Sequence, residues 1–203
     1  MACDDSFLDI STINSELHRR YFQYPSGKGQ ILEFNDIAEW RDHLYTFRIR
    51  SSRVPVVYAA QFHIALKLLL FVWTDGHVLK AAELVALSAL ESSLKFVYYQ
   101  RLHSAMPKKQ IGLADYLEYM ENEDDLSEIY HYEKFKGQPN ALNVIRNGIA
   151  HGDLFTGFPW GGLMETVRDI IEHAFRNYPE CSGPLEQSGN LFLEEGSTAL
   201  DIR

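Results

Sequence analysis

The chain has 203 residues, of which 46% are hydrophobic and 23% charged, so it can bury the core of one domain and is not globally disordered. Its formal net charge of −9 argues against a protein that coats nucleic acid non-specifically, because such binding depends on positive charge. Two distant cysteines, Cys3 and Cys181, favour a reducing, cytoplasmic setting and exclude a disulfide framework or a cysteine zinc site.

The first 34 residues have no clear periodic pattern, and we assign them to an N-terminal extension. No strand pattern in the chain is convincing, although Gln30 to Phe34 could form a short one. The first clear helix is predicted over about 36–49, where apolar residues recur at helical spacing.

Residues 54–73 are almost entirely apolar and are nearly long enough to span a bilayer. Gln61, His63 and Lys67 lie near the middle of this segment, and charge at that depth of a membrane is costly. We therefore expect a buried core helix and no membrane span, with His63 as a hydrogen-bonded core histidine.

A turn at Thr74-Asp75-Gly76 leads into a long helix predicted over about 78–103. One face of this helix is apolar, and another carries a polar stripe. The stripe consists of Ser88, Glu91, Ser92, Lys95 and Tyr99. Two long helices joined by a tight turn predict an antiparallel hairpin at the centre of a bundle.

Three further helices are predicted over about 111–122, 140–151 and 162–178. The predicted fold is therefore an all-α, up-and-down bundle of four to five main helices over 35–178. An N-terminal extension (1–34) precedes it, and a tail (179–203) follows it.

The segment that can carry chemistry lies in the helix predicted over 140–151. On a helix, Leu142, Ile145 and Ile149 form an apolar edge, whereas Arg146, Asn147 and His151 lie on the opposite arc. A guanidinium binds phosphate oxygens, and an imidazole transfers protons near neutral pH, so the three groups suit phosphodiester cleavage. The structural alternative is that Arg146 and His151 only cap carbonyls at the helix end.

This segment resembles the motif of the HEPN family, in which four to six residues separate an Arg from a His and a polar residue follows the Arg. Here four residues separate Arg146 from His151, and Asn147 holds the polar position. The order of a long hairpin, a shorter helix, the motif helix and a final amphipathic helix also resembles that family, over roughly 55–178.

The resemblance implies an all-α bundle that forms a homodimer, in which two motif helices make one ribonuclease site that needs neither metal nor cofactor. His151 would transfer the proton, Arg146 would bind the phosphate of the RNA substrate, and Asn147 would support them. Many members are toxins or defence effectors that are paired with an antitoxin or another partner protein. A non-catalytic HEPN-like module that binds a protein or RNA is the alternative, and a structural bundle without a ligand is a third interpretation.

Two acidic residues are candidates for supporting roles. Members paired with a nucleotidyltransferase antitoxin tend to carry a tyrosine two residues after the His, and this chain has Asp153 there. Asp153 either orients His151 or repels RNA. Glu91 either orients the motif or forms an ordinary surface ion pair with Lys95, and the ion pair is the favoured interpretation.

Overall fold

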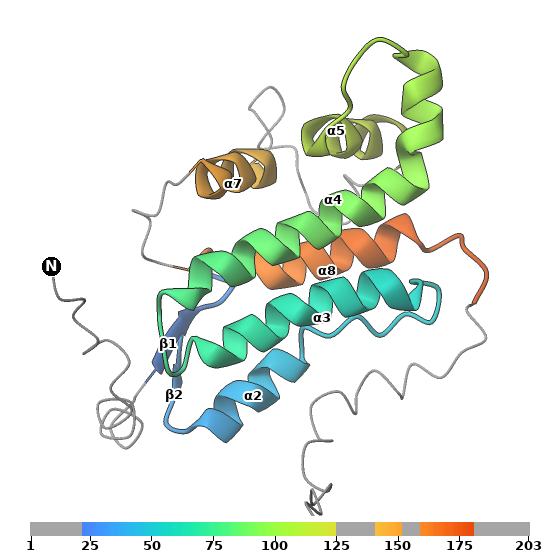
Figure 1. Ribbon diagram of the computed structural model, residues 1–203. Helices are drawn as coiled ribbons and strands as arrows, with labels where there is room; N and C mark the ends of the chain where they lie inside the picture. Colours follow the sequence, from blue (N-terminus) through green and yellow to red (C-terminus); the bar gives the residue numbers. More distant parts are fainter. Residues whose placement is uncertain (1–21, 125–140, 152–158, 181–203) are drawn as a thin grey trace, which may run out of the picture.

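The computed structural model describes residues 22–124, 141–151 and 159–180. These ranges contain six helices and one small antiparallel sheet, which confirms the predicted all-α bundle (Figure 1). The elements are β1 (Phe22–Pro25), β2 (Ile31–Phe34), α2 (Ile37–Tyr45), α3 (Val56–Phe71), α4 (Val78–Ala105), α5 (Leu113–Glu123), α7 (Ala141–Ala150) and α8 (Leu163–Ala174). No helix within the described ranges has both the length and the apolar character that crossing a bilayer requires.

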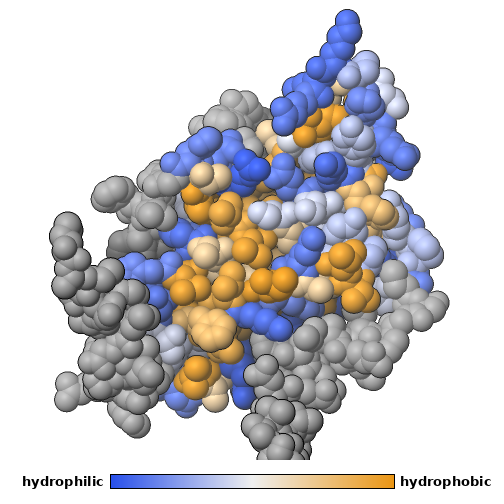
Figure 2. Space-filling model, in the orientation of Figure 1, coloured by the Kyte–Doolittle hydropathy of each residue, from blue (hydrophilic) through white to orange (hydrophobic). Residues whose placement is uncertain are grey.

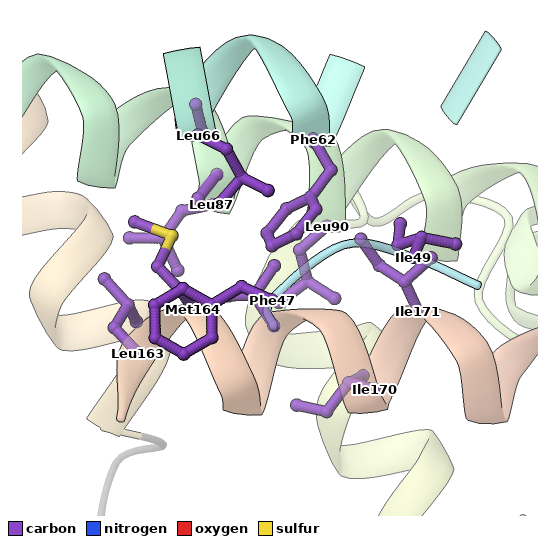
Figure 3. Close-up of a cluster of buried hydrophobic side chains, with 14 of the residues drawn as sticks. Phe47, Ile49, Phe62, Leu66, Leu87, Leu90, Leu163, Met164, Ile170 and Ile171 are labelled. Carbon is purple, nitrogen blue, oxygen red and sulfur yellow. The ribbon is translucent and has the colours of Figure 1, made fainter. Parts of the chain in front are cut away.

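The antiparallel pair of α3 and α4 forms the centre of the bundle, as predicted (Figure 1). Helix α8 packs against α4 on the same side as α3, whereas α5 and α7 lie on the other side of α4. The core between α3, α4 and α8 consists of large aliphatic and aromatic side chains, and part of it is drawn in Figure 3. Its most deeply buried members include Phe62, Leu66, Leu87, Leu90, Met164, Ile170 and Ile171. Helix α4 carries Glu91 and packs against α7, which carries Arg146 and Asn147.

One face of the α3–α4 pair exposes apolar side chains, which gather over these helices in Figure 2. On α3, Val57, Ile64 and Phe71 recur every seven residues and are 57%, 49% and 59% exposed. Residues at this spacing share one side of a helix, so the single chain leaves an apolar strip of α3 in contact with solvent.

A β-hairpin closes one end of the bundle and corrects the expectation that the chain has no convincing strand. Strand β2 lies within the segment from Gln30 to Phe34 that could form a short strand, whereas β1 was not predicted. The two strands are antiparallel, and Tyr24 pairs with Leu32. The rings of Phe22, Tyr24 and Phe34 lie 4.8–5.1 Å from that of Trp40 on α2. The indole N–H of Trp40 donates to the carbonyl of Leu69 at 2.9 Å. The described part of the N-terminal extension is thus packed on the helical core.

The hairpin loop also approaches the start of α8 closely, where Gly27 lies against Gly162. Gly162, which caps α8, has a φ of 80°, and a Cβ there would lie 2.6 Å from the Cα of Gly27. A left-handed backbone and the absence of a side chain are both needed at this position, and only glycine supplies both.

A polar network joins the end of α5 to the end of α8. Arg176 Nη2 and Nη1 donate to Asp124 Oδ1 and Oδ2 at 2.7 and 2.9 Å, and the Tyr98 hydroxyl also donates to Oδ2. The His173 ring nitrogen Nε2 lies 2.7 Å from the Asp124 carbonyl oxygen. Burial would raise the pKa of Asp124, but the hydrogen bonds from Arg176 and Tyr98 outweigh it and hold that pKa below its usual range.

Candidate functional site

Helix α7 buries the apolar edge predicted for it and leaves its polar arc accessible. Leu142 and Ile149 are buried, Ile145 is partly buried, and α7 packs on α4. On the polar arc, Arg146 and Asn147 are partly exposed, whereas Ala150 and His151 are exposed. Burial of one edge therefore fixes which side of α7 a ligand can reach.

Arg146 is held in place by two acceptors. Its Nη2 donates to Glu91 Oε2 on α4 at 3.1 Å, and its Nη1 donates to Asn147 Oδ1 at 3.2 Å. The side chains of Arg146 and Glu91 are 36% and 28% exposed, so the ion pair is neither buried nor fully solvated. A guanidinium carries five N–H donors, so these two bonds leave donors that can meet a phosphate.

Glu91 thus points to α7 rather than along its own helix. The sequence favoured an ion pair between Glu91 and Lys95, but Lys95 Nζ lies over the ring of Tyr99, 5.9 Å from its centroid. That ring stacks on His103, with centroids 5.2 Å apart. The structure therefore brings Glu91 together with Arg146 and Asn147.

Tyr116 on α5 is a further polar group beside this cluster, and the sequence analysis did not single it out. Its side chain is 1% exposed, and its hydroxyl has no hydrogen-bond partner among the described residues. Burial raises the pKa of Tyr116, and the nearby Glu91 carboxylate raises it further. The amphipathic pattern of α5 is consistent with a buried Tyr116, but it does not show that the Glu91 carboxylate lies nearby.

His151 follows the last residue of α7, and its backbone N–H donates to the Asn147 carbonyl at 2.9 Å. Its side chain is exposed, and at 100° per residue it lies about 140° around the helix axis from Arg146, at the other edge of the polar arc. Asp153, the other acidic candidate, lies outside the described residues. Among the residues that are described, no three His, Cys, Asp or Glu side chains come together as metal ligands would.

The described residues offer a positioned cation, an amide and a carboxylate at Arg146, Asn147 and Glu91, and an accessible imidazole at His151 just after α7. This set can bind a phosphate oxygen at Arg146 and exchange a proton at His151. Comparison with known proteins found no matching family model, no matching curated protein and no matching solved structure.

Proposed function

We propose that the chain is a cytoplasmic endoribonuclease that cleaves RNA by attack of a 2′-hydroxyl, without a metal ion, at a site completed by a second copy of the chain. The observation that carries this proposal is the arrangement on α7, where Glu91 and Asn147 hold Arg146 and the side chain of His151, just after the helix, is exposed.

In the proposed reaction the 2′-oxygen forms a bond to the adjacent phosphorus while the bond from phosphorus to the 5′-oxygen breaks. The 2′-hydroxyl proton passes to a base, and a proton is delivered to the leaving 5′-oxygen, which yields a 2′,3′-cyclic phosphate and a 5′-hydroxyl end. His151 is suited to transfer these protons because an imidazole is both base and acid near neutral pH. Arg146 is suited to stabilise the charge on the phosphate oxygens.

Two features of α7 support a homodimer. One His151 and one Arg146 are few groups for two proton transfers and charge stabilisation, and a symmetry-related copy would double them. Val144 on the same helix is 52% exposed, so α7 presents an apolar side chain to solvent in the single chain. Packing of two α7 helices would cover Val144.

The test is cleavage of several RNA substrates in the presence of EDTA by the full chain and by Arg146→Ala and His151→Ala. Both variants should lose cleavage by at least about 100-fold, the lower end for a lost proton-transfer group. Arg101→Ala and His77→Ala serve as matched controls, because both side chains are exposed and belong to α4 or the turn before it. Light scattering should show that every variant stays dimeric. Cleavage that persists unchanged in both site variants would overturn the assignment.

A non-catalytic HEPN-like module that binds a protein or RNA is the second candidate. The Glu91 carboxylate already offsets part of the Arg146 charge, and the whole chain is acidic, which disfavours strong RNA binding. A folded dimer that leaves several RNAs intact would support this candidate.

A toxin or defence role, with an antitoxin or other partner protein, extends the catalytic proposal. Expression of the wild-type chain should then arrest growth of a bacterial host, and His151→Ala should relieve the arrest. Equal toxicity of the variant would separate growth arrest from the proposed chemistry.

A further inference from the structure

A row of side chains on α4 leads away from the candidate site. Its members recur every four residues and are Glu91, Lys95, Tyr99 and His103. Each lies about one turn beyond the last on the helix surface, with a drift of about 40° per step around the axis. Glu91 pairs with Arg146 on α7. The row therefore begins beside the group that is suited to bind phosphate and continues toward the C-terminal end of α4 (Figure 1).

This row runs along the side of α4 that faces α5 and α7. Burial raises the pKa of Tyr116 on α5, and the nearby Glu91 and Tyr99 raise it further. Such effects weaken with distance, so both members of the row lie near one residue of α5. Tyr99 is thus on the same side of α4 as the contact between Glu91 and Arg146.

The aromatic members of the row are stacked and accessible. The rings of Tyr99 and His103 are nearly parallel, at 9°, with centroids 5.2 Å apart. Tyr99 is 39% exposed, and His103 is also exposed. His63 on α3 differs, because its Nε2 is buried without a hydrogen-bond partner among the described residues, which corrects the expectation of a hydrogen-bonded core histidine. An accessible pair of stacked rings is a surface on which an unpaired base can stack.

Lys95 covers the Tyr99 ring only weakly. Its Nζ lies 5.9 Å from the ring centroid, close to the limit of about 6 Å for a cation–π contact, and its side chain is exposed. A base stacked on an aromatic ring contributes more than an exposed contact of this kind. A base can therefore replace Lys95 on the ring, and the displaced ammonium can then meet a phosphate.

The spacing along α4 suits a single strand of RNA. Eight residues separate Glu91 from Tyr99, which corresponds to about 12 Å along the helix axis. A stacked strand rises about 3.4 Å per nucleotide, so a strand with one phosphate at Arg146 brings a base to Tyr99 within about four nucleotides. The bases of a duplex are paired and stacked on one another, so a duplex does not present a base to the ring.

We propose that Lys95, Tyr99 and His103 bind single-stranded RNA beside the candidate site, with one base stacked on the Tyr99 ring and Lys95 on a phosphate. The proposal rests on the proposed ribonuclease function for the identity of its ligand. It narrows the substrate of that site to RNA that is unpaired within a few nucleotides of the cleaved bond.

The experiment measures binding of a fluorescein-labelled 2′-O-methyl oligoadenylate dodecamer to the full chain by fluorescence anisotropy. The 2′-O-methyl group prevents attack by the 2′-oxygen, so binding is separated from cleavage. An abasic dodecamer with the same backbone is the matched probe. The wild-type chain should bind the oligoadenylate at least about five-fold more tightly than the abasic strand, because one stacked base contributes at least that factor.

Two substitutions test the roles of the ring and the ammonium. Tyr99→Ala should weaken oligoadenylate binding at least about five-fold and leave the abasic strand unaffected, whereas Tyr99→Phe keeps the ring and should retain binding. Lys95→Ala should weaken binding of both strands and reduce the slope of log affinity against log salt by about 0.7, as for one phosphate contact. Phe71→Ala and Lys28→Ala are the matched controls, because they remove an exposed ring from α3 and an exposed ammonium from the hairpin loop. Neither control should change binding.

Three results would overturn the proposal: the wild-type chain does not bind the oligoadenylate, it binds the abasic strand as tightly, or Tyr99→Ala binds the oligoadenylate as the wild type does. Cleavage of unmodified RNA in EDTA tests the ribonuclease function separately. Cleavage that depends on Arg146 and His151, together with unchanged binding by Tyr99→Ala, would refute only the RNA-binding row. Binding that depends on Tyr99 without any cleavage would refute only the proposed chemistry.

Discussion

Replacement of Asp124 by Asn tests whether the network between α5 and α8 holds the bundle together. Asn has nearly the same shape as Asp but no charge, and it places an amide N–H₂ where the carboxylate accepted hydrogen bonds. One oxygen can still accept from Arg176 or from Tyr98, but the paired contact with both Nη atoms of Arg176 is lost.

The expected loss of unfolding free energy is about 2 to 3 kcal/mol. Three hydrogen bonds to a charged acceptor contribute about 1.5 kcal/mol or more each, and Asn retains part of that. The Asp124 side chain is only 16% exposed, so water replaces little of the loss, whereas Arg176 is 33% exposed and can regain some hydration. In a chain of 203 residues this loss corresponds to a fall of roughly 4 to 12 °C in Tm.

The same variant should change the response to acid. The folded pKa of Asp124 is depressed, so its contribution to stability is present above the unfolded pKa of about 3.9 and is lost as the pH falls through the folded pKa. Urea unfolding at pH 7 and at steps toward pH 2 should therefore show wild type and Asp124→Asn converging in acid. Asp42→Asn is the matched control, because Asp42 is 67% exposed and should change stability by no more than about 0.5 kcal/mol. A loss below about 0.5 kcal/mol at pH 7, or a difference that does not shrink as the pH falls, would refute the reasoning.

Two further substitutions test other contacts of the fold. Gly162→Ala should destabilise the chain by more than about 2 kcal/mol in urea unfolding, because a left-handed Ala is strained and its Cβ would meet Gly27 Cα at 2.6 Å. Gly76→Ala is the control and should change the unfolding free energy little, because a Cβ at Gly76 has no neighbour within 4 Å. Equal effects of the two substitutions would contradict the contact between Gly162 and Gly27. Glu83→Gln should cost about 2 to 4 kcal/mol by the same measurement, because buried Glu83 pairs with Lys80 at 2.7 Å and accepts from the Trp160 N–H at 2.9 Å. A loss below about 1 kcal/mol would show that this ion pair contributes little.

Helical periodicity located the helices because each has an apolar edge that spans two turns or more. The helix expected over about 36–49 ends at Tyr45, and the one expected over about 162–178 ends at Ala174. In both cases apolar residues continue past the end, such as Phe47 and Phe175, and pack into the core from turns. Periodicity therefore extends a helix when a following turn is also buried.

The β-hairpin was missed for a different reason. Each strand has four residues, so alternation supplies only two inward positions per strand, Phe22 and Tyr24 on β1 and Leu32 and Phe34 on β2. So short a pattern is indistinguishable from an irregular apolar segment. The hairpin is specified by its contact with Trp40, which only the tertiary structure reveals.

The arrangement of the candidate site was predictable in part. The accessible arc of α7 followed from the helical spacing of its residues, whereas the partner of Arg146 did not. Glu91 lies 55 residues away in sequence, and a local rule favoured its neighbour Lys95 four residues along the helix. Which partner Glu91 takes depends on how α7 packs across α4.

The aromatic cluster under the hairpin has a spectroscopic consequence. Trp40 and Trp73 are 0% and 3% exposed, and the Phe22 ring lies 6.1 Å from Trp73 as well as 4.8 Å from Trp40, whereas Trp160 is 42% exposed. Trp160 is already in contact with water, so a change in tryptophan emission will come mainly from Trp40 and Trp73 when water enters beneath the hairpin. Circular dichroism reports the helices instead, and a change in emission that precedes the loss of helical signal would mean that the hairpin detaches while the bundle is still folded.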